Sequence, residues 1–121
     1  MSGLEVSVHR EKDRTVLRVA GELDFSNINQ LQQEIERQDT KIVEIDCSAL
    51  QFMDSSGAGL LLSIARVLNL QNRILEITHI PEHIYHDLDI IGVFRVLESF
   101  KASRPTGGEL KWGKATRKLP I

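Results

Sequence analysis

The feature that most constrains the fold is a strand, a polar turn and an unusually apolar helix that follow one another along the chain. Residues 41–47 (KIVEIDC) form a pattern typical of a buried strand, and residues 60–68 (LLLSIARVL) are too apolar for a surface helix. Between them, residues 52–59 (FMDSSGAG) contain an acid, two hydroxyls and two glycines. We therefore expect the rest of the fold to pack around this helix and to bury most of its sides.

The polar turn has the composition of a helix N-terminus. Asp54 is a good N-cap, because its carboxylate can accept hydrogen bonds from the free N–H groups of the first turn. Ser55 then falls in that turn, where a phosphate would meet open N–H donors and the positive end of the helix dipole. Gly57 and Gly59 carry no Cβ, so we expect another molecule to be able to approach the backbone closely there.

A narrow polar stripe runs along the same helix. Ser56, Gly59, Ser63 and Arg66 recur at helical spacing, and the residues between them are mostly apolar. The helix is therefore expected to be exposed along this stripe, which is either a solvated face or a contact with a partner.

Apolar periodicity predicts an α/β fold with a mixed, mostly parallel sheet of about five strands packed with three to four helices. Strands are expected at residues 4–9, 15–20, 41–47, 73–78 and 93–100. Helices are expected at residues 27–37, 55–70 and 81–91, the first capped by Ser26 and the last closed by Gly92. Residues 21–25 are expected to leave the second strand, and residues 48–51 to form a short loop.

The strand order brings two acidic positions together. Asp24 follows the end of the second strand, and Asp54 and Ser55 follow the neighbouring strand. Sites in parallel sheets form beyond the carboxyl ends of strands, so we expect these residues to lie close together at one edge. Asp24 either caps the helix that begins near Ser26 or helps to position Ser55 and bind a partner.

The charge of the chain is unevenly distributed. The 121 residues carry a net charge of −2, which excludes a general nucleic-acid binder. Residues 101–121 hold six basic residues against one acidic residue, so this segment carries +5 and the first 100 residues carry −7. We therefore expect one domain over residues 1–100 and a basic, loosely ordered extension over residues 101–121, in which Trp112 either packs on the domain or anchors a partner.

Two further features suggest a cytoplasmic protein. Cys47 is the only cysteine, which excludes an internal disulfide and fits a reducing compartment. No apolar run approaches the ~20 residues of a membrane span, and the first residues lack the pattern of a signal peptide.

The chain resembles the bacterial anti-sigma-factor antagonists, small proteins built of one STAS domain. The resemblance rests on Gly21–Asp24 (GELD), on Phe52–Gly57 (FMDSSG) with Gly59, and on the segment Asp87–Gly92, and it covers roughly residues 4–100. The chain departs from the family pattern at Ala58, where a larger residue is usual, at Gln71-Asn72, where glycines are common, and in its basic tail.

The resemblance implies a partner switch. In that family, the serine that follows the motif's aspartate, here Ser55, is phosphorylated by a serine/threonine kinase that is also an anti-sigma factor. The unphosphorylated protein binds the kinase and releases its sigma factor, phosphorylation blocks that binding, and a serine phosphatase resets the cycle. Ser56 is the less favoured acceptor, because a hydroxyl within a helical turn tends to bond locally. The residues expected to contact the kinase are Asp24, Asp54, Ser56, Gly57, Gly59, Ser63 and Arg66.

Other functions have less support in the sequence. A non-catalytic STAS subunit of a transport, secretion or signalling assembly is the main alternative. A phosphate-receiver domain would use Asp54 as acceptor, but it requires an acidic pair at an earlier strand end. We expect no enzyme and no cofactor, because the dinucleotide fingerprint and the nucleophile elbow are absent. We also expect no metal site at His79, His83, His86 and Glu82, and a core position for Cys47.

Overall fold

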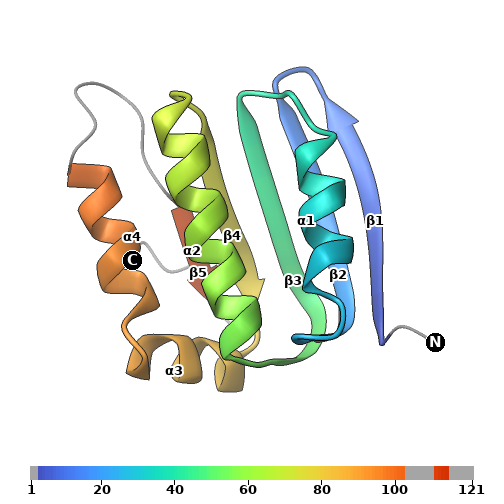
Figure 1. The fold of residues 1–121 in the computed structure, drawn as a ribbon, viewed down its shortest axis with the longest axis vertical. Coiled ribbons are helices and arrows are strands. Elements are labelled where there is room, and N and C mark those ends of the chain that lie inside the picture. Colours follow the sequence, from blue (N-terminus) through green and yellow to red (C-terminus); the bar gives the residue numbers. More distant parts are fainter. Residues whose placement is uncertain (1–2, 103–110, 115–121) are drawn as a thin grey trace.

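The computed structural model describes residues 3–102 and 111–114, which form one five-stranded sheet with four helices (Figure 1). The strands are β1 (Leu4–Glu11), β2 (Arg14–Leu23), β3 (Ile42–Met53), β4 (Ile74–Ile80) and β5 (Lys111–Lys114). The helices are α1 (Ile28–Glu36), α2 (Ser55–Leu70), α3 (Glu82–Ile90) and α4 (Val93–Ala102).

The sheet is mixed and mostly parallel, as the sequence predicts. Its strand order is β1-β2-β3-β4-β5. Only β1 and β2 pair antiparallel, as a hairpin, and the remaining neighbours pair parallel. The register sets Leu17 beside Ile45 and Ile45 beside Ile77, so one face of the three central strands is a continuous apolar row.

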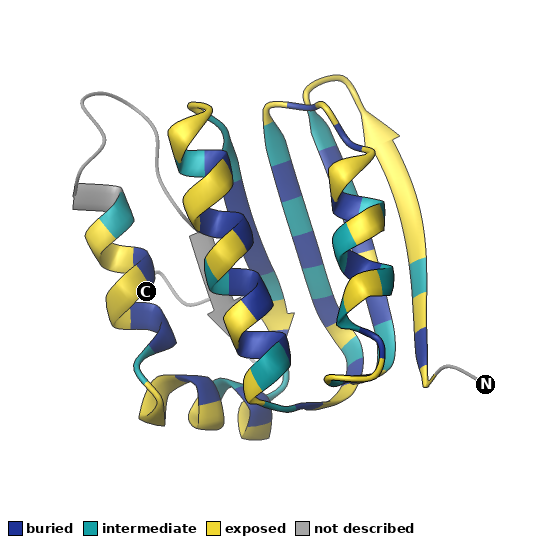
Figure 2. Cartoon of the chain, in the orientation of Figure 1, coloured by how far each residue is buried: buried dark blue, intermediate teal, exposed yellow. Residues whose placement is uncertain are grey.

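The helices form a layer on that apolar face. Figure 1 shows α1 and α2 in front of the sheet with α4 beside α2. Along β3, buried residues alternate with half-buried ones (Figure 2), because every second side chain points toward the helices. Helix α2 buries one side in this core and exposes the predicted stripe, but the exposed side is wider than predicted and includes Val67 and Leu70.

The prediction of a strand at residues 93–100 is wrong, because this segment is helix α4. Val93, Phe94 and Leu97 are buried, while Val96 is 41% exposed. This burial has the helical period and not the alternation of a strand. The β-branched and aromatic composition suggested a strand, and packing against α2 and α3 determines the helix.

Two strands extend into segments that were predicted to be loops. Residues 21–23 belong to β2 and residues 48–51 to β3, where Ala20 pairs with Ala49 and Leu23 with Met53. The register shifts between Arg18 and Ala20, so a bulge interrupts the regular alternation of β2 just where the strand was predicted to end.

Gly21 is required by this pairing. It adopts φ +96°, and a Cβ there would lie 2.0 Å from the carbonyl oxygen of Gly3. A side chain at this position is therefore excluded both by backbone conformation and by the approach of the chain before β1.

Of the two predicted helix ends, the cap at Ser26 is wrong and the stop at Gly92 is confirmed. Ser26 does not cap α1: Asn27 holds the cap position without a side-chain cap bond, and Ser26 donates to Asp24 instead. Gly92, with φ +86°, follows the end of α3 as expected and separates it from α4.

Part of the predicted C-terminal extension has regular structure. Lys101 and Ala102 complete α4, and Lys111–Lys114 form β5, in which Trp112 pairs with Ile77. Residues 103–110 and 115–121 lie outside the described residues, so the rest of that prediction is not tested. The sheet has its fifth strand here and not at residues 93–100.

Candidate functional site

The two predicted motifs meet at the carboxyl ends of β2 and β3. Leu23 pairs with Met53, and the backbone N–H of Asp54 donates to the carbonyl oxygen of Leu23 at 3.1 Å. The expectation that both motifs share one edge of the sheet is therefore confirmed.

Asp54 joins the two motifs through its side chain. Its Oδ1 accepts from the backbone N–H of Gly57 at 3.0 Å, which is the predicted N-cap of α2. Its Oδ2 accepts from the backbone N–H of Phe25 at 3.2 Å, which the sequence did not predict. One carboxylate thus caps the helix and holds the turn between β2 and α1 against it.

Asp24 fixes the conformation of that turn. Its Oδ1 accepts from the backbone N–H of Ser26 at 2.9 Å and from the Ser26 hydroxyl at 2.6 Å. Its backbone N–H donates to Oδ1 of the buried Asn27 at 3.0 Å, and the Asn27 amide donates to the carbonyl of Glu22 at 2.9 Å. The carboxylate of Asp24 therefore orders the loop beside the cap of α2.

Ser55 is the first residue of α2 and is exposed, whereas Ser56 is half-buried. Within the part of the chain that the structure describes, the Ser55 hydroxyl has no hydrogen-bond partner. It sits at the N-terminus of a 16-residue helix, where an added anion meets the positive end of the helix dipole. The arrangement is accessible to a modifying enzyme and tolerant of negative charge.

The two glycines of the motif have different roles. Gly59 is exposed, and an added Cβ would meet nothing within 4 Å, so its surface is open to a partner. Gly57 is buried, and a Cβ there would lie 2.7 Å from Cγ of Met53 and 3.0 Å from Cγ of Leu23. The absence of a side chain at Gly57 therefore serves internal packing and leaves no surface for a partner.

Two exposed phenylalanines, which were not among the residues predicted from the sequence, flank the site. Phe25 is 78% exposed and adjoins Asp24, and Phe52 is 49% exposed two residues before Asp54. Large apolar side chains this exposed beside a polar motif often mark an interaction surface. The available signal was their position in the sequence, Phe25 next to Asp24 and Phe52 two residues before Asp54.

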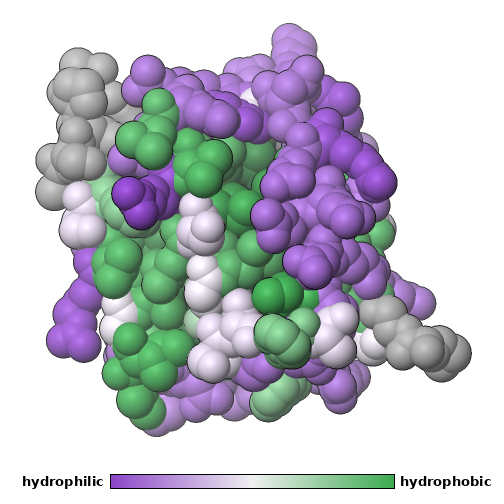
Figure 3. Space-filling view, in the orientation of Figure 1, coloured by the Kyte–Doolittle hydropathy of each residue, from purple (hydrophilic) through white to green (hydrophobic). Residues whose placement is uncertain are grey.

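The predicted stripe continues this surface along α2. Gly59, Ser63 and Arg66 are exposed and Ser56 is half-exposed. Figure 3 shows pale, near-neutral residues running along the helix with hydrophobic surface beside them. Ser56, Gly59, Ser63 and Arg66 thus lie along one side of α2, which begins beside Asp54, and Gly57 is buried.

Cys47 takes the core position that was expected. It is fully buried, and burial together with the nearby charge of Asp46 raises the pKa of its thiol from 9.0 to about 12. A thiol in this state is a poor nucleophile.

The histidines do not gather as the group of His79, His83, His86 and Glu82 that was considered as a metal site from the sequence. His83 lies 2.8 Å from the carbonyl oxygen of Gln51 through its Nε2. His79 instead lies beside Glu44 and Asp46, and these are the three side chains among the described residues that come close enough to share a metal ion. This cluster is on a part of the sheet to which the sequence assigned no function.

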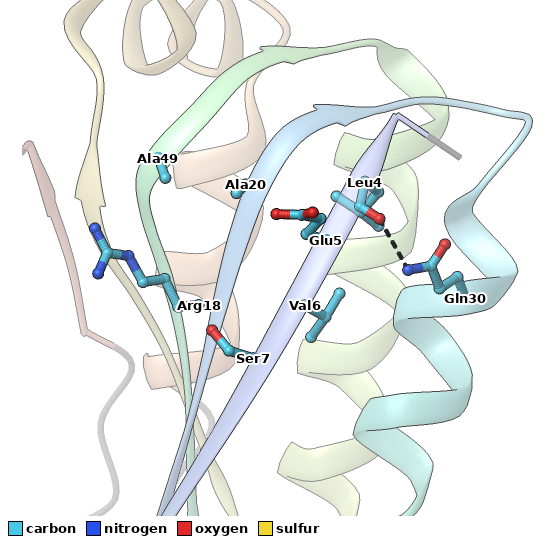
Figure 4. A pocket seen from close by; sticks show the side chains of 8 residues that line it. All are labelled: Leu4, Glu5, Val6, Ser7, Arg18, Ala20, Gln30 and Ala49. Carbon is cyan, nitrogen blue, oxygen red and sulfur yellow. Dashed lines mark hydrogen bonds between the residues drawn. The ribbon is translucent and has the colours of Figure 1, made fainter. Parts of the chain in front are cut away.

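An open pocket of about 630 Å³ lies on β1, β2 and the neighbouring part of β3 (Figure 4). The pocket is open because two of its lining residues, Ala20 and Ala49, have small side chains. Its exposed polar groups come from Glu5, Ser7 and Arg18. The side chain of Gln30 donates to the carbonyl of Leu4 at 3.0 Å. No residue of the serine motif lines it, so we do not assign it to the site.

None of the described helices has the length and apolar character that crossing a membrane requires.

Comparison with known proteins places the chain in a family. A model of the STAS domain matches residues 5–106. The chain is 24% identical over 98 residues to the anti-sigma F factor antagonist of Paenibacillus polymyxa, covering 78% of this chain and 84% of the relative.

Solved structures share the fold. An anti-sigma factor antagonist from Mycobacterium paratuberculosis superposes with a TM-score of 0.67 at 20% identity, covering 76% of this chain and 80% of that one. The anti-sigma factor antagonist SpoIIAA, a Bacillus cell fate determinant, superposes in its unphosphorylated form with a TM-score of 0.67 and in its phosphorylated form with 0.63. Each form is 18% identical to this chain, and each match covers 93% of this chain. The match covers 90% of the unphosphorylated chain and 94% of the phosphorylated chain. The match of the family model over most of the chain confirms the resemblance inferred from the motifs: the chain belongs to the STAS domain family.

Proposed function

We propose that this domain is an anti-sigma-factor antagonist in a phosphorylation-controlled partner switch. The observation that carries the proposal is the exposed Ser55, which opens α2 directly after the capping Asp54 and beside the ordered turn of Asp24. The relatives described above as anti-sigma factor antagonists support the choice of partner.

In this proposal the unphosphorylated protein binds an anti-sigma factor that is also a serine/threonine kinase, and so frees a sigma factor. The kinase transfers a phosphoryl group to Ser55, and a serine phosphatase removes it. The proposal assigns no catalytic step and no cofactor to this chain. It includes a cytoplasmic location, since sigma factors act there.

The proposed binding surface combines polar and apolar groups around the acceptor. Phe25 in the turn after β2 and Phe52 near the end of β3 supply apolar anchors, and Gly59 lets a partner approach the helix backbone. Ser63 and Arg66 extend the surface along α2. Such a mixture of aromatic anchors and a surrounding polar rim is typical of specific protein interfaces.

Phosphorylation would act on this surface through charge. A phosphoserine adds ~−1.5 to −2 charge and three acceptor oxygens. In the free protein the helix dipole stabilises that charge by about 0.3–1 kcal/mol. In the complex the dianion would be buried near Asp54 and Asp24, and an uncompensated buried charge costs several kcal/mol. A cost of about 3–4 kcal/mol weakens binding by roughly 10²–10³-fold.

The test is a binding measurement with variants of Ser55. We expect Ser55→Ala to bind the anti-sigma kinase as tightly as the wild type and to accept no phosphate, and Ser55→Asp to bind at least about tenfold more weakly. Ser7→Asp is the matched control, because it adds the same charge to exposed β1 on another part of the molecule. It should bind normally.

Mass spectrometry after incubation with the kinase and ATP locates the phosphate. Modification at Ser56 alone would move the acceptor by one residue. Equal affinities of the Ala and Asp variants would instead favour the alternative of a non-switching STAS subunit in a larger assembly, and would refute the switch.

A further inference from the structure

A second cluster of chemically active side chains lies on the face of the sheet opposite to α2. Glu44 and Asp46 are two residues apart on β3, so they point to the same face, and Asp46 pairs in register with Thr78 of β4. His79 follows Thr78. One ligand atom from each of Glu44, Asp46 and His79 lies within 4.8 Å of the other two.

An irregular backbone places His79 in this cluster. In a regular strand, the side chain after Thr78 would point to the opposite face, toward the helices. His79 instead adopts φ +55°, a left-handed conformation that is uncommon for residues other than glycine. Its side chain is 50% exposed, with Nδ1 3.7 Å from Oδ1 of Asp46, and the next residue, Ile80, returns to the core.

Both carboxylates are already held by other groups, as metal-ligating carboxylates are. The Ser48 backbone N–H donates to Oδ1 of Asp46 at 2.9 Å. The Thr78 hydroxyl donates to Oε2 of Glu44 at 2.6 Å, and Arg14 donates to Oε1 of Glu44 at 2.8 Å. Such outer hydrogen bonds fix the orientation of ligands before an ion arrives.

The charges around the cluster leave room for a cation. On β3 and β4, three carboxylates occur on this face, from Glu44, Asp46 and Glu76, and β2 carries two arginines there. Arg14 is the first residue of β2 and the register partner of Ile42, the first residue of β3. From this end of the strands it binds both Glu44 and Glu76. Arg18 is the register partner of Asp46 and forms no ion pair with it among the described residues, and Lys111 of β5 is the partner of Glu76. Among the side chains that the structure describes, no arginine or lysine pairs with Asp46 on the side of the cluster that it forms with His79.

We propose that Glu44, Asp46 and His79 form a binding site for a divalent transition-metal ion, and that Zn²⁺ fits it best. One imidazole nitrogen with two carboxylate oxygens suits zinc, whereas calcium and magnesium prefer oxygen ligands alone. Zinc ligands at about 2.0–2.2 Å in a tetrahedron lie about 3.4 Å apart. No two of the three ligand atoms would have to approach by more than about 1.4 Å, because all lie within 4.8 Å of one another. Nδ1 of the half-exposed His79 and Oδ1 of Asp46 are already 3.7 Å apart, and water would supply the fourth ligand.

The test is calorimetric titration of the untagged full-length chain with Zn²⁺. We expect one ion per chain for the wild type, and binding at least about tenfold weaker for His79→Asn and for Asp46→Asn. Both variants should keep the fold. In His79→Asn, asparagine tolerates the left-handed conformation of position 79. In Asp46→Asn, the amide oxygen still accepts the hydrogen bond from the Ser48 N–H. His86→Gln removes another exposed imidazole, on α3, and should bind like the wild type.

Co²⁺ provides an independent readout, because a tetrahedral site gives visible absorption that His79→Asn should lose. The proposal is overturned if the wild type binds no Zn²⁺, or if His86→Gln weakens binding as much as His79→Asn does. The site does not depend on the proposed switch: His79→Asn should still be phosphorylated at Ser55.

Discussion

At the scale of single residues, Asp54 connects the local helix signal to the rest of the fold. One of its oxygens caps α2 through Gly57, and the other holds Phe25 in the turn after β2. A residue that the sequence identifies as a cap therefore also determines where the neighbouring loop lies.

Replacement of Asp54 tests this double role. We expect Asp54→Ala to lower the free energy of unfolding by about 1–2 kcal/mol, because the N–H groups of Gly57 and Phe25 lose their acceptor. Asp54→Asn keeps one carbonyl acceptor and should lose less than half of that. Urea unfolding measures both, and an equal loss in the two variants would contradict the capping role.

The two glycines give a matched pair. Gly57→Ala should destabilise by about 1–3 kcal/mol, because the new methyl group meets Met53 at 2.7 Å and must displace it. Gly59→Ala should stabilise by about 0.5–1 kcal/mol, because it removes backbone freedom from a helix position with open space around it. Thermal and urea unfolding would show opposite signs, and the same sign for both would refute the assigned packing.

The raised pKa of the Cys47 thiol predicts that the folding stability falls at alkaline pH. The folded state keeps the thiol protonated up to about pH 12, whereas an exposed thiol ionises near 9.0. The raised pKa means that stability is full below pH 9 and is lost as the pH rises toward 12. At pH 10.5 this loss is about 2 kcal/mol.

The Cys47→Ala variant isolates that effect. It lacks the thiol, so the difference in unfolding free energy between wild type and variant should shrink by about 2 kcal/mol between pH 8 and pH 10.5. Urea unfolding at both values gives the answer. A difference that stays constant with pH would show that the thiol ionises equally in both states.

At the scale of elements, an ionic contact joins three strands on the face of the sheet opposite to α2. Arg14 of β2 binds Glu44 of β3 and Glu76 of β4, and Glu76 is only 4% exposed. Glu44 and Glu76 are register partners, so their like charges lie side by side. The hydrogen bond from Arg14 to Glu76 is the largest factor that raises the pKa of Arg14, and the guanidinium stays charged.

Removal of Arg14 should therefore be costly. We expect Arg14→Gln to lower the unfolding free energy by about 2–3 kcal/mol, less than for a fully buried pair because Arg14 is partly exposed. Arg10→Gln breaks an exposed pair with Asp39 and should cost about 0–1 kcal/mol. Similar losses in the two variants would show that the inter-strand contact adds nothing beyond a surface ion pair.

At the scale of the whole molecule, the sheet separates two surfaces. The edge at the ends of β2 and β3 carries Ser55 and the exposed side of α2, and the face without α2 carries Glu44, Asp46 and His79. The core between helices and sheet is continuous and includes the buried side of α2. A charge added at Ser55 therefore acts at the surface and does not reach the core.

We expect phosphorylation of Ser55 to leave the fold unchanged. Amide NMR shifts should change near Asp24 and Ser55 and nowhere in β4, and stability should rise by about 0.3–1 kcal/mol through the helix dipole. Ser55→Ala treated with the same kinase is the control. Displacement of α2 in the phosphorylated protein would replace surface exclusion with a refolding mechanism.

The sequence by itself determined what depends on neighbours along the chain. The apolar run of α2, its cap at Asp54, the stop at Gly92 and the strands at residues 41–47 and 73–78 were all predicted, and with them the mixed parallel sheet and the position of Ser55. These features depend on hydrogen bonds and periodicity within a few residues, which a single sequence displays.

Only the tertiary structure decided what depends on residues far apart in the chain. The buried role of Gly57 depends on Leu23, the helical state of residues 93–100 depends on packing against α2, and the strand at 111–114 depends on pairing with β4. His79 meets Asp46 only because the two strands are in register and the backbone turns locally. Contacts of this kind are set by how the elements pack together, and local periodicity carries no record of them.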